Sequence, residues 1–179
     1  MNSVKHHYIL IKDKTMECCE KENETEIEKE YEIIHLAKTK KVCPMCEDYS
    51  RQQASKPVAV VSCEGACLRG EISRQTANLI CHSLAKDTTV RICLGGAFTK
   101  DTGQRNLVRN APKVLILEGC FINCASRMMQ GVIADLKPEV VIVDRLYEFD
   151  TKLFGIDEMS HEEIMSHSKT AADKILATL

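Results

Sequence analysis

The sequence is poor in aromatic residues, lacks tryptophan and carries almost no net charge. Aromatic residues make up 4% of its 179 residues, and the formal net charge is −2 at pH 7. Because no basic stripe interleaves with aromatic side chains, nothing indicates binding to a nucleic acid or a membrane surface. The longest apolar runs have the length of a β-strand, and the N-terminus lacks the apolar core of a signal peptide. We therefore expect a cytoplasmic protein with neither a nucleic acid nor a membrane among its partners.

Phosphate-binding motifs are missing as well. No Gly-x-Gly-x-x-Gly follows an apolar run, and there is no P-loop, so the sequence does not indicate a dinucleotide or a nucleoside triphosphate.

A chain of this length holds one full domain and an appendage. We place an N-terminal helical extension at residues 1–56 and an α/β domain at residues 57–179.

Cysteine, in contrast, is abundant, with ten residues. Structural disulfides are rare in a reducing cytosol, so this number indicates metal binding or catalysis. In a secreted chain the same residues would pair as disulfides. We favour the first interpretation because the apolar strands of this chain can build a core without such cross-links.

Strand-like and helix-like segments alternate along residues 57–179. Apolar runs at 58–62, 89–92, 114–117 and 140–143 have the length and β-branched content of buried strands. Helical patterns follow Cys67 to about residue 85, lie within 102–110, run from Cys124 to about residue 136, and begin again at a capping box at Ser160. This alternation predicts an α/β fold in which an open parallel sheet of about four strands has helices on both faces. Rossmann and flavodoxin-like folds have this three-layer arrangement.

The same pair of cysteines accompanies two of these strands. Cys63 and Cys120 come at strand ends, and Cys67 and Cys124 follow four residues later at the start of a helix; a third strand ends at Cys93. Because the carboxyl ends of parallel strands share one edge of the sheet, we expect these five thiols to meet there. Helix N-termini at that edge favour thiolates, which bind soft metals or attack electrophiles. Four of the five would close either a tetrahedral zinc site or an iron–sulfur cluster.

The N-terminal extension holds four further cysteines that form a candidate second metal or redox site: Cys18, Cys19, Cys43 and Cys46. A capping box at Thr25 predicts a helix that ends near Lys40, and residues 7–12 fit a short edge strand. We expect Cys43 to Cys46 to lie in a loop. Their Cys-x-x-Cys spacing suits zinc and thioredoxin-type redox chemistry alike. We favour metal, because the redox motif needs a strand before it and a helix after it.

Some other polar residues are better explained by structure than by function. Cys81 lies about half a turn from the expected inner face of its helix, which holds Ile72, Thr76, Leu79, Ile80 and Ser83, so we expect a bystander. Asp144 follows the fourth strand and is a weak candidate for the site. We expect six other charged or ionisable residues to lie at the surface: His82, His161, His167, Lys100, Arg105 and Arg109.

Three motifs follow one another in the α/β domain: Cys63-Glu64-Gly65-x-Cys67-x-x-Gly70, Cys93-Leu94-Gly95-Gly96, and Glu118-Gly119-Cys120-x-x-x-Cys124-Ala125. Over about residues 58–150 this set resembles the DGC-domain family, named for an Asp-Gly-Cys triplet before its last cysteine pair. This chain has Glu118 in place of the aspartate and so keeps the carboxylate. The resemblance implies zinc binding through Cys63, Cys93, Cys120 and Cys124, and it implies no particular reaction.

Three functions stay open at this point. The first is a zinc-binding protein whose site is structural or serves sensing or delivery. The second is an iron–sulfur or dithiol redox protein. The third is an enzyme whose metal or thiolate handles a small sulfur-containing or anionic substrate. Four thiolates close a zinc site, whereas three thiolates and a water leave it open for catalysis, and the sequence does not decide between them.

Overall fold

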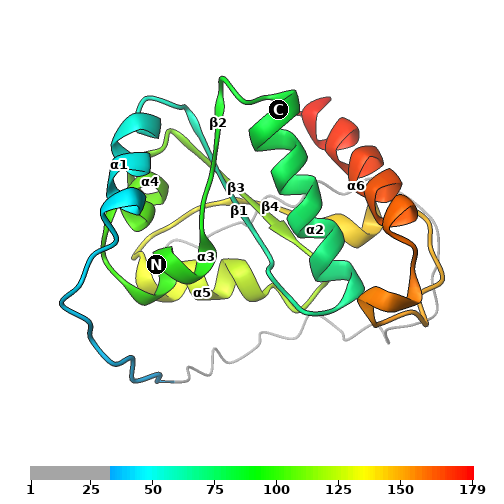
Figure 1. The fold of residues 1–179 in the computed structure, drawn as a ribbon, viewed down its shortest axis with the longest axis horizontal. Coiled ribbons are helices and arrows are strands. Elements are labelled where there is room, and N and C mark those ends of the chain that lie inside the picture. The colour runs from blue at the N-terminus through cyan, green and yellow to red at the C-terminus, as the bar shows by residue number, and fades with distance from the viewer. Residues whose placement is uncertain (1–32) are drawn as a thin grey trace, which may run out of the picture.

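The structure, a computed structural model, describes residues 33–179. Its sheet has four parallel strands in the order β2-β1-β3-β4 (Figure 1). The strands are β1 (Val58–Ser62), β2 (Thr89–Arg91), β3 (Lys113–Glu118) and β4 (Glu139–Ile142). The predicted α/β fold with an open parallel sheet is therefore confirmed. Val143, expected in the fourth strand, instead begins a 3-10 turn over Val143–Arg145.

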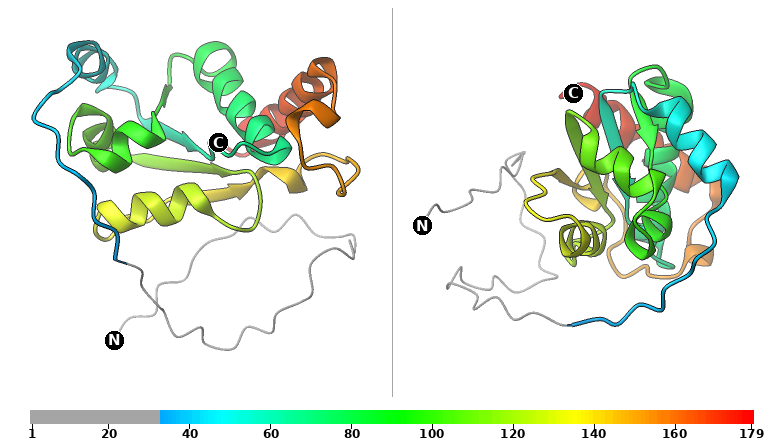
Figure 2. Two further views of the ribbon diagram at one scale, coloured as in Figure 1. Left: turned by 60° about the horizontal axis from the view of Figure 1, so that its bottom comes forward. Right: turned by 90° about the vertical axis from the view of Figure 1, so that its left-hand side faces the viewer.

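Helices cover both faces of the sheet (Figure 2). On one face lie α2 (Leu68–Leu79) and α6 (His161–Leu176), and on the other lie α3 (Leu94–Thr99), α4 (Gly103–Asn110) and α5 (Cys124–Val132). Successive residues of a strand point to opposite faces. Val58 and Val60 of β1 accordingly pack with α2 and α6, while Ala59 and Val61 pack with the other three helices. Burial on both faces explains why the central strands are apolar throughout.

The strand order places a switch point between β1 and β3. The chain passes from β1 to β2 on one side and then crosses to β3 on the other side. In doubly wound sheets, ligands bind outside the carboxyl ends of the two strands at such a point. Here those ends are Ser62 and Glu118, and the register pairs Ser62 with Leu117.

A π-helix, Ile80–Leu84, continues α2 and changes which residues face inward. Its wider turn is closed by a 2.9 Å hydrogen bond from the Ala85 N–H to the Ile80 carbonyl. Cys81 is buried as a result, whereas Ser83 is exposed. The expectation that Ser83 faces the core and Cys81 lies away from it is therefore wrong, because it assumed an unbroken α-helical period.

The predicted N-terminal helix is wrong in the part that the structure describes. Residues 33–43 have no regular secondary structure, and Ile33, Ile34 and Leu36 are exposed. A thin apolar stripe with nothing to pack against supplies little stability, and helices in proteins depend mainly on packing. The capping box at Thr25 and the expected strand at residues 7–12 lie outside the described residues.

The Cys43 to Cys46 segment begins a helix, so its expected loop conformation is also wrong. Helix α1 (Pro44–Gln53) has Cys43 as its N-cap residue and Pro44 in the first turn, where proline is favourable. The helix packs on α4 and on the β2 edge. Gly103 donates its N–H to the Glu47 carboxylate at 3.0 Å, and the Tyr49 hydroxyl donates to the Arg91 carbonyl at 3.2 Å.

The C-terminal capping box has the predicted geometry. The Ser160 hydroxyl accepts a hydrogen bond from the Glu163 N–H, and the Glu163 carboxylate accepts one from the Ser160 N–H. The inward face of α6 is buried, and Ser168 donates to the Ile72 carbonyl of α2. A further 3-10 turn, Ile156–Glu158, precedes α6. Within residues 33–179, no helix is long and apolar enough to cross a bilayer.

Candidate functional site

Two equivalent strand–turn–helix units place two cysteines each at the switch point. Cys63 follows β1 directly, and its N–H donates to the Leu117 carbonyl of β3 at 2.8 Å. Cys67 is the N-cap residue of α2. Cys120 follows β3 after one glycine, and Cys124 is the first residue of α5. We call these four residues, Cys63, Cys67, Cys120 and Cys124, the switch-point cysteines.

Close backbone contacts, one between the two units and one within the first unit, explain two glycines of the motifs. A Cβ atom on Gly119 would lie 2.9 Å from the Arg69 carbonyl and from the Gly70 nitrogen, in the first turn of α2. Within the first unit, a Cβ atom on Gly70 would lie 2.6 Å from the Gly65 carbonyl oxygen. Real Cβ atoms are not found so close to backbone, so only glycine fits unless the backbone shifts. The turn after β3 thus packs directly onto the first turn of α2.

Glu118, the last residue of β3, holds the start of α5 in place. Its buried carboxylate accepts hydrogen bonds from the N–H groups of Ala125 at 3.2 Å and Ser126 at 2.6 Å, and from the Ser126 hydroxyl at 2.7 Å. Carboxylates at a helix N-terminus satisfy unpaired donors and interact favourably with the helix dipole. This contact fixes the positions of the Cys120 and Cys124 backbones. The carboxylate shared with the Asp-Gly-Cys triplet therefore has a structural role in this chain.

Burial and neighbouring charges set the pKa of the two cysteines at the strand ends. Burial raises the pKa of the Cys63 thiol, the nearby N–H groups of Gly65 and Gly119 lower it, and the negative charges of Cys124 and Glu118 raise it again. Burial also raises the pKa of Cys120, opposed by the Ile122 N–H and reinforced by Asp144, Cys67 and Cys124. The switch-point cysteines are thus close enough for the charge of one to affect another.

The thiols gather at one edge but do not form a ready-made cage. The Cys63 and Cys67 sulfurs would lie 3.4 and 3.7 Å from a Cβ atom on Gly65. Among residues 33–179, however, no three His, Cys, Asp or Glu side chains stand where they could hold one metal ion. The thiols match zinc by their chemistry, and their side chains would have to turn inward to bind it.

Asp144 lies at the same edge and has a structural partner. Its carboxylate is 3.4 Å from Nε of Arg69 in α2. Burial raises the pKa of Asp144, while the Arg69 and Arg145 charges lower it. Arg69 also donates to the carbonyls of Leu153 and Thr151. These contacts join α2 to the 3-10 turn after β4 and to the loop that follows that turn.

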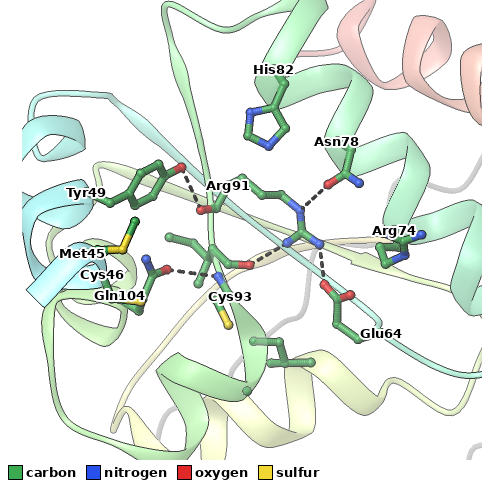
Figure 3. A pocket seen from close by; sticks show the side chains of 13 residues that line it. Met45, Cys46, Tyr49, Glu64, Arg74, Asn78, His82, Arg91, Cys93 and Gln104 are labelled. Carbon is green, nitrogen blue, oxygen red and sulfur yellow. Dashed lines mark hydrogen bonds and ion pairs between the residues drawn. The ribbon is translucent and has the colours of Figure 1, made fainter. Parts of the chain in front are cut away.

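Cys93 follows β2, the strand that pairs with β1, and is the N-cap residue of α3. Its N–H donates to the buried Gln104 side chain at 3.0 Å, and its sulfur accepts from the Gly96 N–H at 3.3 Å. It lines an open pocket of about 540 Å³ (Figure 3) together with Cys46, Arg91 and ten other residues, none of them a switch-point cysteine. The negative charge of Cys93 raises the pKa of Cys46. The structure therefore brings Cys93 next to the Cys43 to Cys46 segment.

The other candidate residues have varied surroundings. Cys43 and Cys46 are exposed at the start of α1, Cys81 is buried in the π-helix, and Cys18 and Cys19 lie outside the described residues. Arg105 donates to the Ala97 and Phe98 carbonyls. Arg109 forms an ion pair with Asp101. The Lys100 ammonium donates to the Thr39 carbonyl at 2.9 Å.

Sequence reasoning missed the pocket and the residues that shape it. The Arg91 guanidinium donates to Asn78 at 3.2 Å and pairs with Glu64 (Figure 3). It also donates to the Ser62 hydroxyl at 2.7 Å. These residues come from β1 and the turn after it, from β2 and from α2, so no local pattern groups them. For the start of helix α1, in contrast, Pro44 was a usable sequence signal, since proline is common in the first turn of a helix.

The fold is a doubly wound, three-layer α/β fold with a parallel sheet. Its site is a set of paired cysteines at the switch point of that sheet, so the class is a doubly wound protein with a thiol-lined sheet edge. Within that class, the family model of the DGC domain matches residues 59–169, and the chain belongs to the DGC-domain family. The match includes the switch-point cysteines and Cys93, and it excludes Cys43 and Cys46. Comparisons with curated proteins and with solved structures found no match.

Proposed function

We propose that this DGC-domain protein binds zinc through the thiolates of the switch-point cysteines, Cys63, Cys67, Cys120 and Cys124. The observation that carries the proposal is the repeated strand–turn–helix unit, which has two cysteines at the β1–α2 connection and two at the β3–α5 connection, on the same edge of the sheet. Zinc takes four sulfur or nitrogen ligands in a tetrahedron, and thiolate is among its preferred ligands. Four cysteines at one edge would supply that donor set.

The electrostatics of this edge favour a cation. Beyond burial, which raises the pKa of both thiols most, the negative charges of Cys124 and Glu118 raise the pKa of Cys63, and those of Asp144, Cys67 and Cys124 raise the pKa of Cys120. A divalent cation would offset that repulsion and stabilise the thiolates, as metal binding does at cysteine sites generally. A zinc ion with four thiolate ligands leaves no open position for substrate, so the site would stabilise the domain or sense zinc.

The test is metal analysis of protein purified without oxygen, with an absorption spectrum. We expect about one zinc ion per chain and no visible colour. Cys63→Ser and Cys120→Ser should each lose most of the zinc, whereas Cys81→Ala, which removes a buried thiol from the π-helix, should keep it. Full zinc content in both serine variants would overturn the proposal, and a brown protein would identify an iron–sulfur cluster instead.

Cys93→Ser tests the ligand set itself. The four switch-point cysteines suffice in our proposal, so this variant should keep its zinc. Loss of zinc from Cys93→Ser together with its retention in Cys67→Ser would replace our set with the one implied by the family resemblance.

A further inference from the structure

We propose that Cys43 and Cys46 form a second functional site, a thiol–disulfide exchange pair that reduces small disulfides entering the pocket between α1, α2 and β2. The proposal goes beyond zinc binding and does not depend on it, because these two cysteines lie outside both the switch point and the matched DGC domain.

The first support is the position of the pair at the start of α1. Cys43 is the N-cap residue, Cys46 lies in the first turn of this ten-residue helix, and both are exposed and free. The positive end of a helix dipole favours a thiolate there. The redox interpretation of a Cys-x-x-Cys segment requires this helix, although residues 33–43 do not form the strand that usually precedes it.

The second support is that α1 is fixed against the α/β domain. Glu47 and Tyr49, next to Cys46 in the chain, bond to α4 and β2. Ser50 is buried, and its hydroxyl donates to the Cys46 carbonyl at 2.8 Å. The pair is therefore held at a defined place on the domain surface rather than on a free tail.

The third support is the pocket beside the pair. Its volume of about 540 Å³ is in the range of small-molecule sites. Figure 3 shows Met45 and Cys46 of α1 on one side, Arg74 and Asn78 of α2 on the other, and Cys93 between them. A disulfide bound here would lie next to the Cys46 thiol, which lines the pocket and is hydrogen-bonded to Cys43, its neighbour in the Cys-x-x-Cys segment.

The two thiols differ in a way that assigns their roles. The backbone N–H of Cys46 and then its thiol lower the pKa of Cys43, although the Cys43 sulfur does not accept a capping hydrogen bond of standard geometry. Cys46 has its pKa raised, first by its hydrogen bond to Cys43 and then by burial and by the charges of Cys43 and Cys93. Cys43 is the N-cap residue, at the positive end of the helix dipole, and this position together with its lowered pKa assigns it as the attacking thiolate. Cys46, within the first turn of α1, is then the resolving thiol.

The exchange balances without any further reactant. The Cys43 thiolate attacks a disulfide R–S–S–R′, forming a bond to one sulfur and releasing R′–S⁻, which takes up a proton. Cys46 then loses its proton and attacks the Cys43 sulfur, forming the Cys43–Cys46 disulfide and releasing R–S⁻, which takes up that proton. The substrate gains two electrons, and the cysteine pair loses them.

The test uses the full reduced chain, loaded with zinc, with glutathione disulfide as the probe. Peptide mapping by mass spectrometry should find the Cys43–Cys46 disulfide as the main product. Cys46→Ser should instead accumulate glutathione on Cys43, and Cys43→Ser should react at least about tenfold more slowly. Cys81→Ala, which removes a buried thiol that does not line the pocket, should still form the Cys43–Cys46 disulfide without loss of zinc.

Three results would overturn the proposal. One is equal reactivity of Cys43 and Cys93. Another is the absence of a trapped mixed disulfide in Cys46→Ser. The third is release of zinc as the Cys43–Cys46 disulfide forms in the wild-type chain, which would make this pair metal ligands.

Discussion

At the scale of single residues, the carboxylate of Glu118 in the last cysteine motif has a structural role, because it holds the start of helix α5. Its side chain is buried at the end of β3, and all three of its hydrogen bonds go to the first residues of α5. A buried carboxylate is costly unless it is fully hydrogen-bonded. These bonds offset that cost and set the position of the Cys124 backbone.

Glu118→Gln should destabilise the protein by about 1–3 kcal/mol, because an amide accepts at only one of its two ends and loses the charge-assisted bonds to two N–H donors. Urea denaturation measures the change. Glu148→Gln, at an exposed position, is the control and should change the stability little. Equal stability of the Glu118 variant and the control would contradict the assigned role.

At the scale of elements, the two strand–turn–helix units are joined by backbone packing. The turn after β3 lies against the first turn of α2 at Gly119, too close for a side chain. The relative position of the switch-point cysteines therefore depends on this contact.

Gly119→Ala should cost about 1–3 kcal/mol and weaken zinc binding, since the added methyl group would push the two turns apart. Gly131→Ala is the matched control, because a Cβ atom there meets nothing within 4 Å. In the helix α5 it should be neutral or stabilising by up to about 1 kcal/mol. Thermal unfolding with and without zinc measures both. A Gly119→Ala variant as stable as Gly131→Ala would show that the turns can separate freely.

The elements also show which parts of the fold the sequence could predict. The strands, α4, α5 and α6 follow from apolar periodicity and capping, which are local signals. The helix expected before Lys40 failed because its apolar stripe has no packing partner within the described residues, and α1 was missed although Pro44 marked its start. The π-helix after α2 buries Cys81 and exposes Ser83, the reverse of what an unbroken α-helix would do, and no local sequence pattern predicted the wider turn.

At the scale of the whole molecule, the switch point unites residues from four elements. Parallel strand order alone predicted that Cys63 and Cys120 would lie near each other. That Cys93 lines a pocket together with Cys46 depends on how α1 packs against β2 and α4, which sequence reasoning could not see.

Zinc affinity should rise with pH. Burial raises the pKa of Cys63 and Cys120, so both thiols are protonated near neutral pH and must lose their protons to bind the metal. At least two protons are therefore released, which gives a rise of at least about two log units in affinity per pH unit, or at least about 10⁴-fold between pH 6 and pH 8. Competition with a chelator whose own pH dependence is known measures this slope. An affinity independent of pH over that range would mean that these thiols are already ionised or take no part.

X-ray absorption at the zinc edge tests the central claim most directly, because it reports the atoms bound to the metal. Four sulfur neighbours at about 2.3 Å are expected in the wild-type chain, and fewer in Cys63→Ser and Cys120→Ser. A first shell of nitrogen and oxygen at about 2.0–2.2 Å, unchanged in both variants, would contradict a thiolate site at the switch point.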